Sequence, residues 1–130
     1  MGEQGFRFGV IGCGGMASQV HCPNMAAIKG AQTVAYCDVD LTRAEGLLAQ
    51  FGGEYATADA QRIFDDASLD GVLIQTGERW HPQLVQGAAR AGKAIFCEKP
   101  IAVHLADALE TVRVVEGLCV HFQFGTCNRL

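Results

Sequence analysis

The sequence lacks a long apolar run, and its first residues do not have the pattern of a signal peptide. No apolar stretch in its 130 residues approaches the roughly 18 residues that a membrane-spanning helix needs. The first five residues, Met-Gly-Glu-Gln-Gly, lead directly into a predicted strand, so we expect no signal peptide. The two absences predict a protein with no membrane partner.

Basic charge and paired cysteines are also scarce. Ten Lys and Arg stand against 14 Asp and Glu, for a net charge of −4, and without a basic stripe a nucleic-acid partner is not expected. The six cysteines form no C-x-x-C pair and no zinc spacing, so no metal site is predicted. Cys37, Cys97 and Cys119 lie in apolar, strand-like runs and are interpreted as small buried hydrophobes. We therefore expect a reduced, cytoplasmic protein.

Strand and helix patterns alternate along the chain with short connections. The length fits one domain, and 49% hydrophobic residues are enough for a core. The alternation predicts an α/β fold, a doubly wound parallel sheet with helices on both faces. Ligands of such sheets bind beyond the carboxyl ends of the strands. The expected strands are 5–11, 33–37, 54–56, 71–75, 94–97 and 119–124, and the expected helices are 17–28, 40–51, 59–64, 81–91 and 104–116.

The first and last helices carry specific expectations. Pro23 removes an N–H from the first helix, so we expect a kink or a break there. His21 has no second ligand at helical spacing and is interpreted as a surface histidine. In the last helix, Leu105, Leu109 and Val112 are expected to face the core.

A glycine turn follows the first strand. Gly12, Gly14 and Ala17 fit G-x-G-x-x-A, in which small residues allow the tight turn, the approach of a pyrophosphate and close helix packing. The N–H groups at a helix start favour negative charge. The pattern therefore predicts a dinucleotide site, and an ordinary strand-to-helix turn is the alternative. The candidate cofactor-binding residues here are Gly12, Cys13, Gly14, Gly15 and Met16.

Asp38 ends the second strand, about 20 residues after the turn, where a carboxylate can bind the adenosine ribose. It could instead cap the next helix, but Asp40 can do that. The charge of Asp38 should repel a 2′-phosphate, which favours NAD, while Arg43 could pair with a phosphate or stack on adenine and leaves NADP possible. Thr76 with its loop, and Glu98-Lys99-Pro100, follow two further strands and should lie at the same sheet edge.

Several segments together resemble the glucose–fructose oxidoreductase/inositol dehydrogenase (Gfo/Idh/MocA) family. They are 9–17, Ala-Tyr-Cys-Asp at 35–38, His81 opening a helix, and 91–100 with Glu-Lys-Pro at its end. The resemblance implies a Rossmann domain that binds NAD or NADP. It also implies hydride transfer between nicotinamide and a hydroxyl carbon of a sugar or polyol substrate.

The resemblance also implies roles for individual residues. Lys99 would act at the reacting carbon, where a lysine can hydrogen-bond the substrate hydroxyl and help to move its proton. Glu98 would meet the nicotinamide ribose, and Thr76, Gly77, His81 and Lys99 would contact the cofactor. The Lys99–Pro100 bond is expected to be cis, an isomer that X–Pro bonds adopt at a cost of only about 0.5–1 kcal/mol.

The chain departs from the family in two ways. The loop that usually reads Thr-Pro-Asn is Thr76-Gly77-Glu78, and the second α/β domain of the family is absent. We expect a dinucleotide-binding domain over 1–124 and the start of a linker over 125–130, in either a truncated piece or a natural short protein. Apolar surface around Phe122 and Phe124 would then be bare and favour a homo-oligomer.

Three functions remain open on the sequence alone. The first is the cofactor half of an NAD(P)-dependent oxidoreductase, which alone binds the cofactor without turnover. The second is a dinucleotide-binding or sensing module without catalysis, and the third is an FAD-binding Rossmann unit, against which Glu98-Lys99-Pro100 argues.

Overall fold

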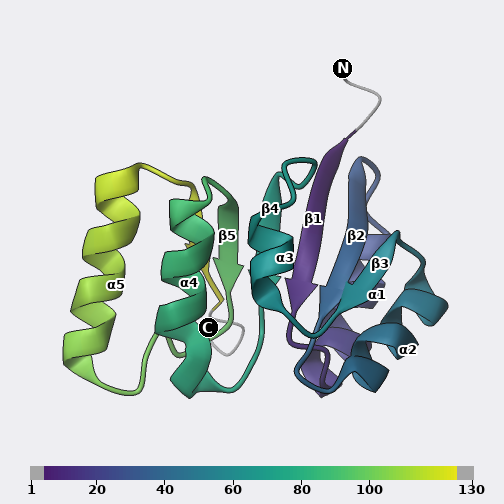
Figure 1. Ribbon diagram of the computed structural model, residues 1–130, viewed down its shortest axis with the longest axis horizontal. Coiled ribbons are helices and arrows are strands. Elements are labelled where there is room, and N and C mark those ends of the chain that lie inside the picture. The colour runs from purple at the N-terminus through teal and green to yellow at the C-terminus, as the bar shows by residue number, and fades with distance from the viewer. Residues whose placement is uncertain (1–4, 126–130) are drawn as a thin grey trace.

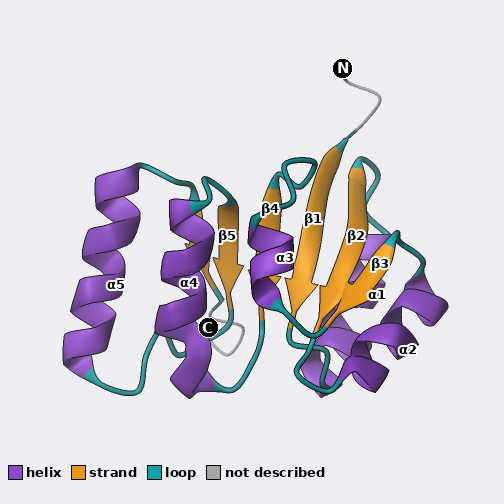
Figure 2. Cartoon of the chain, in the orientation of Figure 1, coloured by secondary structure: helices purple, strands orange, loops and turns teal. Residues whose placement is uncertain are grey.

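The computed structural model of the chain describes residues 5–125. Six strands form one sheet in the order β3-β2-β1-β4-β5-β6, and every neighbouring pair is parallel. All the strand arrows that Figure 2 displays point to the same edge of the sheet. The doubly wound α/β fold is therefore confirmed. The strands are β1 (Phe6–Ile11), β2 (Ala31–Cys37), β3 (Tyr55–Thr57), β4 (Gly71–Ile74), β5 (Ala94–Cys97) and β6 (Phe122–Phe124).

Helices cover both faces of the sheet (Figure 1). On one face, residues of α1 and α2 pack with Phe8, Val10 and Tyr36. On the other face, residues of α3, α4 and α5 pack with Ile74 and Ile95. The helices are the π-helix η1 (Ala17–His21), α1 (Cys22–Ala26), α2 (Leu41–Phe51), α3 (Ala60–Phe64), the 3-10 helix η2 (Glu78–Trp80), α4 (His81–Arg90) and α5 (Leu105–Leu118).

The strand register brings four strand ends level. Ile11 pairs with both Cys37 and Ile74, and Ile74 pairs with Cys97. The strand order reverses between β1 and β4, which is the switch point at which doubly wound sheets bind ligands. The segments that begin at positions 12, 38, 75 and 98 therefore leave the sheet along one edge.

The first helix divides as the sequence predicts. Its π-helical part, η1, ends at His21, and α1 begins with Pro23 in its first turn. The N–H of Cys22 reaches back to the carbonyl of Ala17, a bond of the wider π type. A turn of this type is a recognised cause of a helix kink.

Residues of α5 face differently from the prediction. The exposed fractions of Leu105, Leu109 and Val112 are 74%, 56% and 40%, so their expected inward orientation is wrong. The buried residues of α5 are Thr111 and Val115. Thr111 can be buried because its hydroxyl donates to the Asp107 carbonyl and accepts from the Gln86 side chain.

Two expectations at the end of the chain also need correction. Cys119 is exposed and has a φ of 55°, because it occupies the left-handed position that ends α5. Phe122 packs against the core instead of lying bare, and Phe124 is half-buried. An open apolar hollow of about 240 Å³ lies instead on the α1 face, lined by residues such as Phe6, Phe8 and Phe96.

Over residues 5–125, no helix has the length and apolarity to cross a membrane. The same residues contain no group of three or more His, Cys, Asp or Glu side chains placed to hold a metal ion. Residues 126–130, most of the expected linker, lie outside the described part of the chain.

Candidate functional site

The glycine turn sits directly beyond β1. Gly12 has a φ of +99°, and a Cβ there would lie 2.7 Å from the backbone carbonyl of Gln75. A Cβ at Gly14 or Gly15 would meet nothing within 4 Å. The backbone N–H groups of Gly14, Gly15 and Met16 donate to no acceptor among residues 5–125. The turn therefore needs glycine at position 12 for the fold, while Gly14 and Gly15 leave open space and positions 14–16 present free N–H donors.

Asp38 is bound to the same turn. Its Oδ2 accepts the N–H of Cys13 at 2.8 Å, and its Oδ1 accepts the N–H of Asp40 at 2.8 Å. An ionised carboxylate has about four acceptor sites, so each oxygen keeps capacity for another donor. Asp40 itself caps α2 by accepting the N–H of Thr42, as the sequence predicts for this residue.

A cleft of about 560 Å³ lies between the glycine turn and the segments that follow β2 and β4. Gly12, Cys13, Gly14, Asp38, Arg43, Thr76 and Gly77 all line it, so the sheet edge brings these seven predicted residues together. Among the cofactor-binding candidates, Gly15 and Met16 are exposed just beyond the turn. Arg43 Nε lies 3.7 Å from Asp40 Oδ2, and both side chains are more than half exposed.

The same cleft contains two residues that the sequence patterns did not indicate. Trp80, the one tryptophan of the chain, is 50% exposed and lines the cleft. Gln75 also lines it, and both polar atoms of its amide are buried without a hydrogen-bond partner among the described residues. A buried, unpaired amide normally finds a partner, and a polar ligand in the cleft fits that need. Neither residue belongs to the glycine motif, so no spacing rule could have found it.

Glu98, Lys99 and Pro100 follow β5. Glu98 is buried and its Oε1 lies 2.7 Å from His21 Nε2, while Lys99 is exposed. The Lys99–Pro100 bond is cis, as predicted. The interpretation of His21 as a surface histidine is wrong, because its side chain is 18% exposed and paired with Glu98 across 77 residues of sequence.

Cys13 lies within the turn but is not set up as a nucleophile. Burial, and then the nearby charge of Asp38, raises the pKa of the Cys13 thiol to about 12. Its Sγ donates to the carbonyl of Cys37. Because the thiolate is the reactive form, Cys13 serves the turn through its backbone and its packing.

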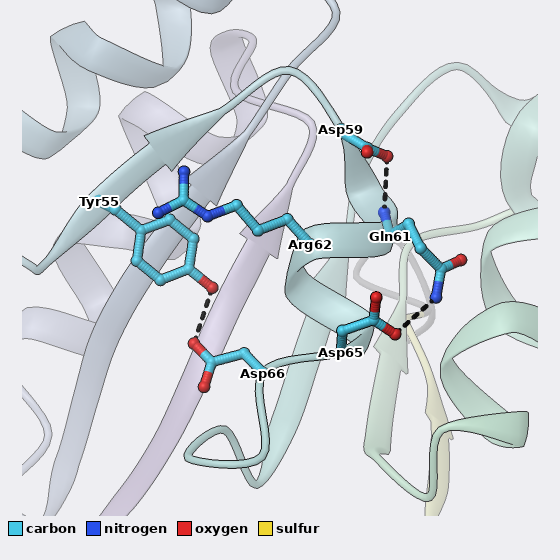
Figure 3. A pocket seen from close by; sticks show the side chains of 6 residues that line it. All are labelled: Tyr55, Asp59, Gln61, Arg62, Asp65 and Asp66. Atoms are coloured by element: carbon cyan, nitrogen blue, oxygen red, sulfur yellow. Dashed lines mark hydrogen bonds between the residues drawn. The ribbon is translucent and has the colours of Figure 1, made fainter.

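A second hollow, of about 490 Å³, lies on the flank of the molecule beside α3 (Figure 3). Its polar groups pair with one another: Tyr55 donates to Asp66 at 2.7 Å, and Gln61 donates to Asp65 at 2.8 Å. The Arg62 guanidinium lies 4.1 Å from the centre of the Tyr55 ring. We interpret the residues around this hollow as a structural cluster, because their hydrogen bonds stabilise the loop between α3 and β4.

The cluster makes stability depend on pH. Burial opposes ionisation of Asp66, but hydrogen bonds from Ser68 and Tyr55, together with the charge of Lys93, outweigh it and lower its pKa. A lowered pKa stabilises the fold above the unfolded value of about 3.9, and that stability is lost as the pH falls. Tyr55→Phe should cost about 1 kcal/mol at pH 7, and the difference from wild type should shrink below pH 4 in urea titrations. A constant difference from pH 7 to pH 3 would contradict this role.

The fold and the cleft define an NAD-binding Rossmann domain. A model of the oxidoreductase family with an NAD-binding Rossmann fold, Gfo/Idh/MocA, matches residues 6–126. The chain belongs to this family, as its resemblance predicted, and the family description names NAD, not a flavin.

Individual relatives agree with this assignment. Inositol 2-dehydrogenase 2 of Saccharopolyspora erythraea is 36% identical over 84% of this chain and 31% of its own length. D-apiose dehydrogenase of Paraburkholderia graminis is 39% identical over 92% of this chain and 32% of its own. The structure of scyllo-inositol dehydrogenase from Lactobacillus casei with bound NAD(H) and scyllo-inositol is 27% identical, with a TM-score of 0.86 over 93% of this chain and 36% of that one. The chain thus spans about a third of the length of these relatives.

Proposed function

We propose that this chain is the cofactor-binding part of an NAD-dependent oxidoreductase that acts on a hydroxyl carbon of a sugar or polyol. One observation carries the proposal. The glycine turn, Asp38 and the loop after β4 surround one cleft at the switch point of the sheet, and Glu98 and Lys99 leave the neighbouring strand end.

The residues of the cleft fit a dinucleotide. The free N–H groups of Gly14, Gly15 and Met16 would bind the pyrophosphate, since nothing fills the space beside the two glycines. The remaining acceptor capacity of Asp38 would serve the adenosine ribose hydroxyls. The unpaired amide of Gln75 fits a polar ligand, because it offers both a donor and an acceptor.

Lys99 is the proposed catalytic residue, and Glu98 is proposed to contact the nicotinamide ribose. NAD, when bound, accepts hydride from the substrate carbon. The amino group of Lys99 would hold the substrate hydroxyl and take part in moving its proton. The His21 pair fixes Glu98, so the backbone that carries Lys99 leaves an anchored strand end.

We expect the 130-residue chain to bind NAD without oxidising a polyol. Lys99 is exposed, whereas hydride transfer needs a positioned substrate and a site that excludes water. We propose that the segment corresponding to the remaining two thirds of the relatives' length positions the substrate and excludes water from the site. Because Trp80 lines the cleft, NAD titration should change its fluorescence, while absorbance at 340 nm with inositols and aldoses should stay flat.

Two outcomes would count against this proposal. An unchanged Trp80 signal, together with no heat of NAD binding in calorimetry, would remove the cofactor role. Robust turnover that is lost in Lys99→Ala would show that this chain positions the substrate and excludes water without a further segment. Binding without turnover also fits a stand-alone sensing module. Turnover by a longer chain, extended to the relatives' length, would distinguish the oxidoreductase from the sensing module.

A cytoplasmic location and homo-oligomerisation are further proposals. Sedimentation velocity tests whether the chain forms an oligomer.

Asp38 should set the preference between the two nicotinamide cofactors. Its negative charge should repel the 2′-phosphate of NADP, so wild type should bind NAD more tightly. Asp38→Asn keeps the shape but removes the charge, and should narrow the ratio of the two dissociation constants by about tenfold. Asp65→Asn is the matched control, because Asp65 lies in the hollow beside α3 and outside the cleft, and should leave the ratio nearly unchanged. Tighter binding of NADP than NAD by wild type would overturn this role.

A further inference from the structure

His81 connects two loops of the site through one ring. It is the first residue of α4 and is only 1% exposed. Its Nε2 lies 3.0 Å from the carbonyl oxygen of Thr76, and its Nδ1 lies 2.5 Å from that of Pro100. Thr76 belongs to the loop after β4 and Pro100 to the loop after β5, so the ring spans the two.

Both partners of the ring are hydrogen-bond acceptors. A backbone carbonyl accepts only, and a neutral imidazole has a single N–H, whereas the imidazolium has two. The two bonds therefore form together when both ring nitrogens carry a proton, and each neutral tautomer keeps one of them. The ionisable groups on the adjoining segments are Glu78 and Arg79 in η2 and Glu98 and Lys99 after β5, of which Glu98 is paired with His21.

The two loops carry different parts of the proposed site. Thr76 and Gly77 line the cleft, and Lys99 directly precedes Pro100. The backbone hydrogen bond from Glu98 N–H to the Ile74 carbonyl ends the pairing of the two strands. Beyond it, His81 is the side chain that joins Thr76 to Pro100.

We propose that His81 is a positioning residue that holds the Thr76–Gly77 loop and the Lys99–Pro100 loop at a fixed spacing. The inference rests on the proposed function, in which one loop contacts the dinucleotide and the other carries the catalytic lysine. His81 acts through these loops, since its ring is buried and both of its nitrogens already face protein carbonyls. The position of Lys99 relative to Thr76 and Gly77 would thus be fixed before the cofactor binds.

Three substitutions separate the two connections. An Asn amide nitrogen reaches approximately the place of Nδ1 and a Gln amide nitrogen that of Nε2, so His81→Asn keeps the Pro100 bond and His81→Gln keeps the Thr76 bond. His81→Ala removes both. His104→Ala is the control, because His104 is exposed and its side chain makes no cap at the start of α5.

Backbone amide NMR spectra of the 130-residue chain test the connection without cofactor. The amide of Gly77 reports on the Thr76 carbonyl, and the amide of Ile101 reports on that of Pro100. His81→Asn should shift Gly77 and spare Ile101, His81→Gln should do the reverse, and His81→Ala should shift both. If His81 merely packed at the start of α4, His81→Asn and His81→Gln would not shift different amides.

Calorimetric titration with NAD tests the positioning role. We expect binding about tenfold weaker in His81→Ala, about threefold weaker in each conservative variant, and unchanged in His104→Ala. Equal shifts of Gly77 and Ile101 in His81→Asn and His81→Gln would overturn the proposal, as would unaltered NAD affinity in a folded His81→Ala. If wild type binds no NAD, but His81→Asn shifts only Gly77 and His81→Gln shifts only Ile101, the proposed function fails while the connection between the loops stands.

Discussion

Gly12→Ala should destabilise the domain and abolish NAD binding. The φ of +99° at Gly12 suits glycine, and an added Cβ would lie 2.7 Å from the Gln75 carbonyl and 2.8 Å from the Thr76 nitrogen. These are backbone atoms at the switch point of the sheet, so relief requires that β1 and β4 separate. We expect a loss of roughly 1–3 kcal/mol from backbone strain and roughly 1–3 kcal/mol from overpacking. Urea titration monitored by circular dichroism measures the loss.

Gly14→Ala is the matched comparison, because its Cβ would meet nothing within 4 Å. This substitution should leave the free energy of unfolding within about 0.5 kcal/mol of wild type. It should nevertheless weaken NAD binding at least tenfold, since the methyl group occupies the space proposed for the pyrophosphate. Equal NAD affinity in Gly14→Ala and wild type would remove the pyrophosphate from this turn. A Gly12→Ala domain as stable as wild type would contradict the structural reason for that glycine.

The sequence could predict the strands and the shared edge because these depend on local patterns. Continuous apolar runs such as 71–74 specify buried parallel strands, and the turn at Gly12 has a local fingerprint. Once the strands are parallel, their carboxyl ends must lie on one edge, so the meeting of Asp38 and Thr76 follows from topology. The actual strand order and register add that these ends are level.

Contacts between distant residues could not be predicted in this way. No local pattern connects His21 to Glu98, which meet because the last residue of η1 places the His21 ring 5.6 Å from the Phe96 ring of β5. The sequence also did not predict the buried face of α5, because the apolar pattern favoured Leu105 and Leu109 as its buried residues. A hydrogen-bonded Thr111 took the buried place instead. Polar residues become suitable for the interior when a partner comes from another element, and sequence spacing does not reveal that partner.

Lys93 illustrates the same limit and gives a second large expected effect. In the sequence, Lys93 stands out only as part of the family-like run that ends in Glu-Lys-Pro. In the structure it is 5% exposed, and its Nζ donates to the carbonyls of Asp66 and Leu69 at 2.6 and 2.9 Å. The ammonium therefore holds the loop between α3 and β4 from within, where water cannot replace it. The positive charge also helps to lower the pKa of Asp66.

Lys93→Met should lower the free energy of unfolding by about 2–6 kcal/mol, because two carbonyls around the buried ammonium lose their donor at roughly 1–3 kcal/mol each. The pKa of Asp66 should rise in the variant, so unfolding by acid should begin at a higher pH. Lys29→Met is the control, since Lys29 is exposed and should change stability by less than about 0.5 kcal/mol. The loop lies at the amino end of β4, opposite the cleft, so the folded fraction of Lys93→Met should bind NAD with wild-type affinity. A stability loss no larger than that of Lys29→Met would show that the buried ammonium is not what holds this loop.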